Sequence, residues 1–349
     1  MKAKTFFIAV LTGVLACFAG LILLVSAEDH FFLLSGIQEG DAALFDNQRY
    51  QMAGLIRHQD YSAVVMGTSL VANYRASWFT EGLGEQTLKI TFPDGWISEF
   101  DAALNLAFRT HQSLNTVFFG LDPNIMIRPD SQRTVELPRS LYNVNPLDDV
   151  EFLLNADTLQ YAALSWVRRQ FLEPVTLDEA YVWDGDGVTG FSRTTAFAAY
   201  IRPEASGTVL PADAYLDVTD ENLDIVCRWA EEHPEVRFVI WFPPYSVLYW
   251  DKTDREGTTE AVITAVEHAA RRLLEYDNVA VYCFLGDVDT ITNLDNYGDH
   301  IHCSGAITRQ TAQRMMDGLW RLTRENCRAR MDSLRQFAAE YDFESLFAE

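Results

Sequence analysis

A serine, a histidine and an aspartate occupy chain positions from which they can form one nucleophilic catalytic site. Ser69 stands in the segment Gly-Thr-Ser-Leu at 67–70, directly after an apolar run, and Asp299 and His302 stand in Asp-His-Ile-His at 299–302. A serine hydroxyl is a weak nucleophile until a base removes its proton. His302 can be that base while Asp299 orients the imidazole. This pattern predicts ester hydrolysis or acyl transfer.

Each half of this pattern also has an ordinary explanation. A serine after Gly-Thr is usually a turn residue or a helix cap, and a single histidine is more often structural than catalytic. The joint pattern is more informative because the strand, the serine, the later strands and the Asp-x-x-His segment follow in the order that a catalytic site requires.

The elements that must position these residues are visible in the apolar pattern. Five runs have strand length and β-branched or aromatic content, and each is nearly continuous, as expected for strands buried on both faces. They are Ser62–Gly67, Thr87–Phe92, Thr116–Asp122, Val236–Phe242 and Val279–Phe284.

Helical patterns alternate with these strands at Trp96–His111, Asp220–His233 and Thr258–Tyr276. This alternation predicts an α/β fold with a five-stranded parallel sheet between two layers of helices. The turn after the first strand then lies at the carboxyl edge of the sheet, where ligands of open α/β sheets bind. Ser69 is expected there, at a helix start where its own amide can stabilise an oxyanion.

A long interval at about 123–218 interrupts the alternation, and a structureless loop of this length would be unusual. It contains a predicted helix at Pro146–Phe171 and the segment Trp-Asp-Gly-Asp-Gly at 183–187, which is a turn or, less simply, a calcium loop without the full ligand spacing. We expect an inserted cap region on the carboxyl side of the sheet. After His302, the pattern predicts one long helix from Ser304 to about Arg330, followed by a short amphipathic tail.

The N-terminus differs from the rest of the chain. Lys2 and Lys4 precede an uncharged stretch from Thr5 to Ala27, and acidic residues follow at once. A bilayer-spanning helix needs roughly 20 apolar residues. We therefore expect residues 1–27 to anchor the chain in the cell membrane by one helix (5–27), with residues 28–349 outside because positive flanks stay in the cytoplasm. The alternatives are a signal peptide cut after Val25-Ser26-Ala27 and a lipoprotein modified at Cys17.

The net charge of −23 excludes some partners. A surface this acidic repels nucleic acid and anionic lipid headgroups, so neither is an expected partner. Four cysteines lie beyond the apolar stretch: Cys227, Cys283, Cys303 and Cys327, of which Cys283 is expected in the core. Their spacing matches no zinc pattern, although an exported chain could pair some of them. No cofactor is predicted from the sequence.

At residues 67–70 and 299–302, the chain resembles the SGNH/GDSL hydrolases, whose Gly-Asp-Ser-Leu block follows the first strand and whose terminal block is Asp-x-x-His. The resemblance covers roughly residues 60–325. It implies a flavodoxin-like, three-layer α/β/α fold, a triad of Ser69, His302 and Asp299, and action on esters without a metal. The family includes envelope O-acyltransferases, and the membrane-anchored D-alanyl transfer protein of teichoic acid modification is similar.

The chain departs from this family at the expected oxyanion-binding positions. Gly95 is the nearest equivalent of the glycine in the second block, and Asp122 stands where the third block has an oxyanion-binding asparagine. An ionised carboxylate there would repel an oxyanion, so either Asn124 replaces it, Asp122 has another role, or activity is weak or lost. Val71 occupies the second glycine of a Gly-x-Ser-x-Gly elbow, which argues against the α/β-hydrolase fold.

Two further groups have weaker functional interpretations. The residues around the Asp-x-x-His segment could gather a metal ion, although no second ligand cluster is evident. The aromatics around Pro243-Pro244 could stack on a sugar ring, although core packing is the simpler explanation. The first group is Asp295, Asp299, His300, His302 and Cys303, and the second is Trp241, Tyr245, Tyr249 and Trp250.

These observations predict a membrane-anchored, extracytoplasmic serine esterase or O-acyltransferase. Its substrate would be an acylated cell-envelope glycan or a small ester, and transfer would involve a membrane-bound acyl donor protein. The alternative is a catalytically inactive protein of the same fold that binds glycans or assists envelope assembly, with Asp122 marking the loss of catalysis. A metal hydrolase is the third hypothesis.

Overall fold

The computed structural model describes residues 3–37, 42–145, 147–149, 152, 156–168, 171, 174–183 and 190–348. The chain divides into two compact units, and each is described by itself. The first comprises Met1–Gln59, Asn105–Thr110 and Leu137–Ala180, and the second comprises Asp60–Leu104, His111–Glu136 and Tyr181–Glu349. The interval 123–218, expected as one inserted cap, is thus shared between the two units.

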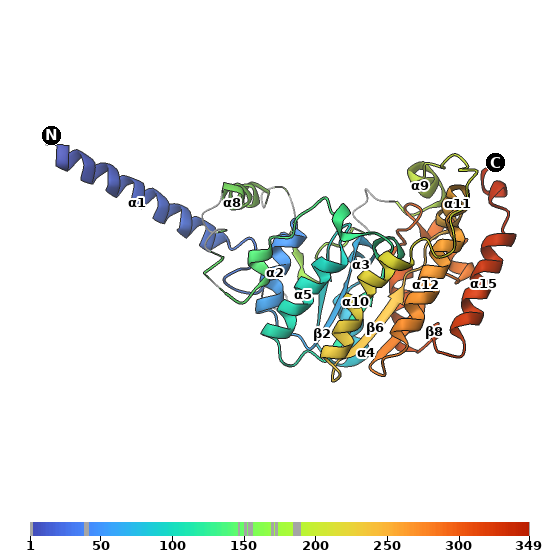
Figure 1. The fold of residues 1–349 in the computed structure, drawn as a ribbon. Coiled ribbons are helices and arrows are strands. Elements are labelled where there is room, and N and C mark those ends of the chain that lie inside the picture. Colours follow the sequence, from blue (N-terminus) through green and yellow to red (C-terminus); the bar gives the residue numbers. More distant parts are fainter. Residues whose placement is uncertain are drawn as a thin grey trace. The chain divides into compact units, whose positions relative to one another are not determined.

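The first unit begins with the apolar helix α1 (Ala3–Glu28), drawn in blue in Figure 1. By length and composition, its residues Ala3–Ala27 can cross a membrane, with a mean hydropathy of 2.8 in the most apolar window. A signal sequence passes the same test. The apolar character predicted for the N-terminus is therefore present as a continuous helix.

Short elements make up the rest of the first unit. Helix α2 (Gln48–His58) begins at Asn47, whose side chain accepts the amide of Tyr50. The predicted helix at Pro146–Phe171 appears as α8 (Ala156–Arg168) in the described part of that interval, and α8 packs against α1. The Gly-Asp segment at 184–187, with its calcium alternative, lies outside the described residues. The remaining elements are β1 (Ala42–Ala43) antiparallel to β5 (Val175–Thr176), and the 3-10 helices η2 (Arg139–Tyr142) and η3 (Leu177–Glu179).

The second unit is built on a six-stranded sheet with the order β3-β2-β4-β6-β7-β8. The five predicted strands are present within one or two residues of their expected bounds, and they are mutually parallel. Their side chains are almost wholly buried, as the continuous apolar runs indicated. The strands are β2 (Ala63–Gly67), β3 (Thr87–Thr91), β4 (Thr116–Gly120), β6 (Arg237–Phe242) and β7 (Val279–Cys283).

The prediction of a five-stranded, all-parallel sheet was incomplete. A sixth strand, β8 (Arg321–Leu322), pairs antiparallel with β7. It interrupts the single helix predicted from Ser304 to Arg330, which consists instead of α14 (Gly305–Met316) and α15 (Cys327–Glu340). Helix α14 ends because the backbone of Gly318 is left-handed, with a φ of 71°. The backbone of Trp320 is also left-handed, with a φ of 65°.

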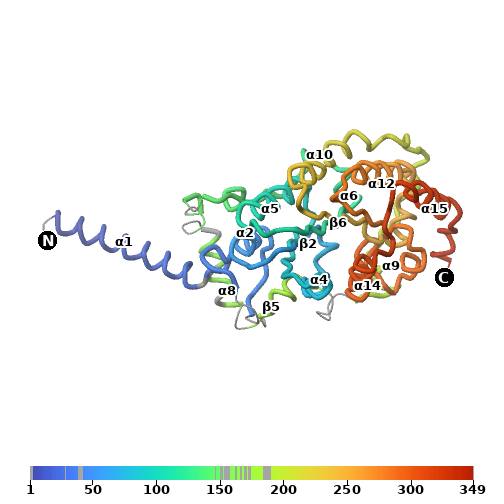
Figure 2. The backbone as a smooth tube through the Cα atoms, turned by 90° about the horizontal axis from the view of Figure 1, so that it is seen from below, coloured from blue at the N-terminus to red at the C-terminus, as the bar shows by residue number. Residues whose placement is uncertain are grey.

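Helices cover both faces of the sheet. The three helices predicted from sequence are α5 (Ile97–Thr110), α10 (Leu216–Glu232) and α12 (Thr259–Leu273). On one face, Phe119 of β4 contacts Phe100 of α5 and Trp229 of α10, each with ring centroids 5.4 Å apart. Figure 2 shows α10 and α12 on one side of β2 and β6, with α4 (Ala76–Leu83) and α14 on the other.

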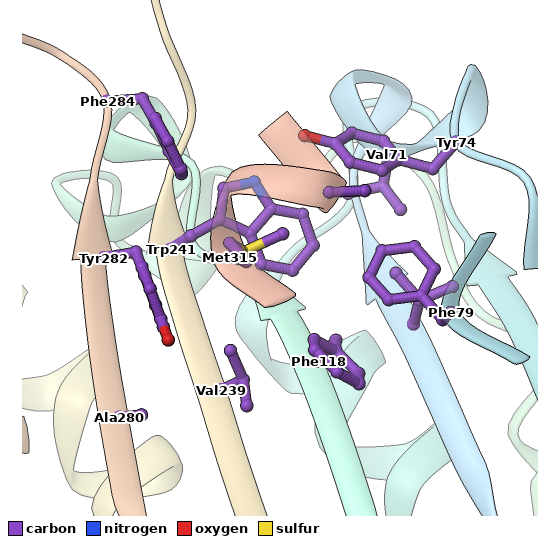
Figure 3. Packing of buried hydrophobic residues seen from close by; sticks show 12 residues of the cluster. Val71, Tyr74, Phe79, Phe118, Val239, Trp241, Ala280, Tyr282, Phe284 and Met315 are labelled. Atoms are coloured by element: carbon purple, nitrogen blue, oxygen red, sulfur yellow. The ribbon is translucent and has the colours of Figure 1, made fainter. Parts of the chain in front are cut away.

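The opposite face holds a continuous aromatic core (Figure 3). Phe118 of β4 packs on Phe79 of α4 with ring centroids 4.7 Å apart, and Trp241 of β6 lies near Tyr74. Met315 of α14 completes this cluster. The result is an α/β unit whose central sheet is shielded from water on both sides, which leaves the strand ends as the places where ligands can approach.

The aromatics around Pro243-Pro244 belong to this interior. Each is at most 2% exposed, so the prediction that they are core residues is confirmed and none is available to stack on a sugar; they are Trp241, Tyr245, Tyr249 and Trp250. The remaining described elements are α3 (Ser69–Ala72), α6 (Pro123–Met126), α9 (Arg193–Ala199), α11 (Val247–Glu256), α13 (Val288–Ile291), η1 (Asp130–Gln132), η4 (Leu294–Asn296) and η5 (Phe343–Phe347).

Candidate active site

Ser69 lies at the carboxyl edge of the sheet, where the sequence placed it. β2 ends at Gly67, Thr68 caps α3 by accepting the amide of Leu70 at 3.4 Å, and Ser69 is the first residue of that helix. The amide of a first helical residue has no partner inside its own helix. α3 itself therefore does not use this amide, which is the oxyanion donor expected from the sequence.

Two residues of the sequence hold α3 close to the sheet. A Cβ at Gly67 would come within 2.4 Å of Val71 Cγ2, so only glycine permits this approach. Lys89 of β3 is 4% exposed, and its Nζ donates to the carbonyls of Ala72 at 2.8 Å and Tyr74 at 2.7 Å. A buried cation thus fixes the C-terminal end of the helix that carries Ser69. Nothing in the linear pattern identified Lys89.

The structure brings Ser69, His302 and Asp299 together. Ser69 Oγ lies 2.8 Å from His302 Nε2, and His302 Nδ1 lies 2.6 Å from Asp299 Oδ2. Because an ionised carboxylate only accepts, Nδ1 carries the ring proton, which leaves Nε2 as the acceptor of the serine hydroxyl. The side chains of His302 and Asp299 are 21% and 27% exposed, so the site is reachable from solvent.

The three-residue spacing of Asp299 and His302 has a structural reason. Asp299 Oδ1 accepts the amides of Ile301 at 2.8 Å and His302 at 2.7 Å, so the carboxylate that orients the imidazole also shapes the turn that carries it. Burial by itself would raise the pKa of Asp299. The hydrogen bond and charge of His302, with the two amides, outweigh burial and lower the pKa to about 2.

His300 is not part of this constellation. Its carbonyl accepts the amide of Ser246 at 3.1 Å and the Ser246 hydroxyl at 2.9 Å, which anchors the loop before His302. Burial lowers the pKa of the His300 imidazole, so this ring favours its neutral form. Its role in the described structure is to secure the loop.

The imidazole of His302 has an aromatic neighbour that sequence reasoning missed. Trp183 meets the ring edge-on, with centroids 5.3 Å apart and an interplanar angle of 82°. Trp183 is itself held by the bond from its amide to Asn73 Oδ1 at 3.1 Å and by stacking on Phe191 at 5.4 Å. No linear signal links position 183 to position 302.

Asp122 is buried beneath the serine and has a structural partner for each oxygen. Oδ1 accepts the Asn124 amide at 2.8 Å and the Tyr245 hydroxyl, and Oδ2 accepts the Thr68 hydroxyl at 3.1 Å. Burial raises its pKa, and these hydrogen bonds partly oppose the rise. Asp122 therefore ties the N-terminus of α6 to the residue before Ser69.

The two other predicted oxyanion residues differ in position. The Gly95 amide donates to the Phe92 carbonyl at 3.0 Å within its own turn, and Gly95 does not line the cavity, so its expected role as an oxyanion donor is not supported. Asn124 does line the cavity, where its Nδ2 donates to the Tyr245 hydroxyl at 3.2 Å. An amide nitrogen carries two hydrogens, so one remains for a ligand.

A cavity of about 600 Å³ opens beside the serine. It is formed within the second unit by α3, by residues 94 and 122–132 and by α11, and Ser69 and His302 lie in its wall. The lining residues are Thr68, Ser69, Asp94, Asp122, Asn124, Ile125, Ile127, Arg128, Pro129, Gln132, Tyr215, Lys252, Ile301 and His302.

The structure also bears on the two hypotheses that involve cysteines and a metal ion. No disulfide joins any of the five cysteines, Cys17 included, so the pairing considered for an exported chain is absent from the structure; Cys227, Cys283, Cys303 and Cys327 are buried. Burial raises the pKa of Cys283 to about 12, as expected for a core thiol. Among the residues described, no three His, Cys, Asp or Glu side chains are grouped to hold a metal ion. Asp295 instead accepts the Arg193 amide at 2.9 Å.

No family model matches this chain, and no curated protein matches it significantly.

Proposed function

We propose that this protein is a membrane-anchored serine esterase or O-acyltransferase that acts outside the cytoplasm on acyl groups of a cell-envelope glycan. One observation carries the proposal: the continuous hydrogen-bonded chain from Ser69 Oγ through the His302 ring to Asp299, at 2.8 and 2.6 Å. The three side chains are reachable from solvent beside a cavity, which is the arrangement of a nucleophile, its base and an orienting carboxylate.

The geometry supports a two-step reaction. Ser69 Oγ attacks the ester carbonyl as its proton passes to His302 Nε2, and the resulting imidazolium is stabilised by Asp299. The tetrahedral adduct collapses, the ester C–O bond breaks, and Nε2 returns the proton to the departing alkoxide. Acyl-Ser69 then reacts with a second hydroxyl by the reverse sequence. Water as the second nucleophile gives hydrolysis, and a sugar hydroxyl gives transfer.

The oxyanion would be held by the Ser69 amide and Asn124 Nδ2. Removing one such donor costs roughly 3–4 kcal/mol of barrier in serine hydrolases. The Asp122 carboxylate, which would repel the oxyanion, is engaged by Thr68, Tyr245 and the amide of Asn124. We infer that Asp122 is a positioning residue, and that Asn124 replaces the asparagine of the SGNH/GDSL pattern.

The fold favours the same family. The order of the five parallel strands, β3-β2-β4-β6-β7, corresponds to the 2-1-3-4-5 order of flavodoxin-like sheets. The reversal of strand order falls beside β2, and Ser69 follows that strand. Gly67 and Gly120 are register partners in β2 and β4, so the residues after them, among them Ser69 and Asp122, leave the sheet at the same edge.

Helix α1 supports the membrane location. Its Ala3–Ala27 segment is long enough to span the bilayer, and Lys2 and Lys4 lie at its N-terminal end. We infer that the chain crosses the membrane once with its C-terminal part outside, where acylated glycans and a membrane-bound acyl donor would be accessible.

The test uses the full-length chain in a neutral detergent. A fluorophosphonate probe should label Ser69, and Ser69→Ala should abolish both labelling and turnover of p-nitrophenyl acetate. Ser333→Ala, on the exposed face of α15, is the matched control and should change neither. Turnover that persists in pure Ser69→Ala protein would reject Ser69 as the nucleophile. A wild-type chain that is neither labelled nor active would favour the non-catalytic glycan-binding alternative.

A further inference from the structure

Basic side chains line the cavity beside Ser69, although the chain as a whole is strongly acidic. The chain carries 50 acidic and 27 basic residues, and only four of the basic ones are lysines: Lys2, Lys4, Lys89 and Lys252. Lys2 precedes α1, Lys4 lies in its first turn, and Lys89 is buried beneath α3. Lys252 therefore has no evident structural duty, yet it lines the cavity that contains the serine and histidine.

In the described structure, the ammonium group of Lys252 has no direct partner. Lys252 belongs to α11, and within the described part of the chain no hydrogen bond or ion pair engages its ammonium group. The preceding residue, Asp251, is directed elsewhere, to Arg202 at 2.8 Å and to the hydroxyl of Tyr200 at 2.8 Å. Lys252 shares the cavity wall with the uncharged side chains of Tyr215 and Ile301, and its ammonium group is available to pair with a ligand there.

A second cation lines the same cavity in a fixed position. The Arg128 guanidinium lies 3.9 Å from the centroid of the Trp96 ring, and Nη1 donates to Asp94 at 2.8 Å. Asp94 offsets this charge only in part because its side chain is 64% exposed and therefore screened by water. Stacking fixes the guanidinium before any ligand arrives, which reduces the entropy cost of binding.

The other acidic residue in the wall is Asp122, and burial raises the pKa of its carboxyl group, which disfavours its negative charge. Asp122 is buried and accepts hydrogen bonds from Thr68, Tyr245 and the Asn124 amide. A ligand in the cavity thus meets one free ammonium and one partly compensated guanidinium, while the rest of the molecule repels anions. A positively charged cavity in an otherwise acidic molecule favours ligands that carry negative charge.

We propose that the cavity binds an anionic group, a carboxylate or a phosphate, on the saccharide whose acyl ester reacts at Ser69, with Lys252 and Arg128 as its cationic contacts. This inference rests on the proposed function and narrows its substrate to acidic glycans. A neutral acylated sugar would leave Lys252 unpaired on entering the cavity, and desolvation of that charge would weaken binding.

Direct binding tests the inference without requiring catalysis. Calorimetry on the full-length chain in neutral detergent compares trigalacturonate, a carboxylate probe, with glycerol 3-phosphate and with neutral galactotriose. We expect one or both anions to bind more tightly than galactotriose, with affinity falling as salt is raised. The stronger anion identifies the preferred source of charge.

Variants locate the binding site. Lys252→Met should weaken anion binding by at least about tenfold, as expected for one charge-assisted contact, and Lys252→Gln should do the same. Arg309→Met removes one positive charge from the exposed face of α14, outside the cavity, and should leave anion affinity unchanged.

The outcomes separate this inference from the proposed function. Equal or absent binding of all three probes, or equal losses in Lys252→Met and Arg309→Met, would overturn the anionic-substrate inference. Fluorophosphonate labelling of Ser69 in the same wild-type sample reports independently on the nucleophile. A chain that binds anions at Lys252 without labelling would retain the anion site and lose the catalytic proposal.

Discussion

At the scale of single residues, the two carboxylate oxygens of Asp299 have different partners and different structural roles. One accepts the ring proton of His302, and the other accepts the amides of Ile301 and His302. Orientation of the base and formation of the turn are therefore inseparable. This explains why an Asp-x-x-His spacing, and not merely the presence of both residues, is informative in a sequence.

The pKa of Asp299 leads to a prediction about stability. The folded state lowers the pKa from 3.8 to about 2, so it favours the carboxylate form. This stabilisation is fully present above the unfolded value and is lost as pH falls through about 2. The difference corresponds to about 2 kcal/mol. Asp299→Asn cannot titrate, so its free energy of unfolding should fall less between pH 5 and pH 2.5 than that of the wild-type chain.

Urea unfolding of both proteins at the two pH values, in the same detergent, measures this difference. Glu204→Gln is a suitable control because Glu204 is an exposed carboxylate remote from Ser69, Asp299 and His302 in sequence. If Asp299→Asn and the wild-type chain lose the same free energy on acidification, the carboxylate does not stabilise the fold in the way that its contacts indicate.

At the scale of elements, the position of Ser69 depends on how closely α3 approaches the sheet. Gly67 has Val71 Cγ2 within 2.4 Å of the site of a Cβ, and Gly120 has the same methyl group within 2.8 Å. One side chain of α3 thus occupies the space that two strand glycines leave open. The position of Ser69 is set by backbone packing as much as by hydrogen bonds.

We expect Gly67→Ala to displace α3 and lower esterase turnover by about 100-fold, the cost of roughly 1 Å of misplacement in an active site. Steady-state turnover of p-nitrophenyl acetate and fluorophosphonate labelling both measure the effect. Gly286→Ala is the matched control, since a Cβ there meets nothing within 4 Å. Unchanged turnover in Gly67→Ala would mean that α3 tolerates the methyl group without moving Ser69.

The sequence allowed the central strands, three helices and the triad to be predicted because each leaves a local signature. Continuous apolar runs identified strands buried on both faces, and the order of the chain placed Ser69 and His302 at one edge. Strand β8 escaped because two residues carry no periodicity and its position follows from the left-handed conformation of Gly318. Trp183, Lys89 and the network of Asp122 escaped for another reason: their contacts join segments far apart in sequence.

At the scale of the whole molecule, charge and hydropathy are segregated along the chain. The first 27 residues hold two lysines and no acidic residue, so the remainder carries −25 against −23 for the full chain. The second unit combines this acidity with a cavity lined by Arg128 and Lys252. The acidic surface repels anions, and the two basic side chains attract them. Anionic ligands are therefore favoured at the cavity and disfavoured elsewhere.

Helix α1 allows the membrane-anchor hypothesis to be tested on the mature protein. If α1 spans the membrane uncleaved, the mature protein should retain its N-terminal residues and resist extraction by alkaline carbonate, whereas a chain lacking residues 1–27 should be extracted. Intact mass measurement distinguishes the alternatives. A mass that begins at Glu28 would identify a cleaved signal peptide, and one that begins at a lipidated Cys17 would identify a lipoprotein.

The lack of a disulfide among the five cysteines has a practical consequence for the fold as a whole. Four of these cysteines are buried, and none bridges to another. The native state is thus reached by packing and hydrogen bonding without oxidative cross-linking. A reductant breaks no cross-link in this structure, so a reductant added during purification should leave the molecule intact.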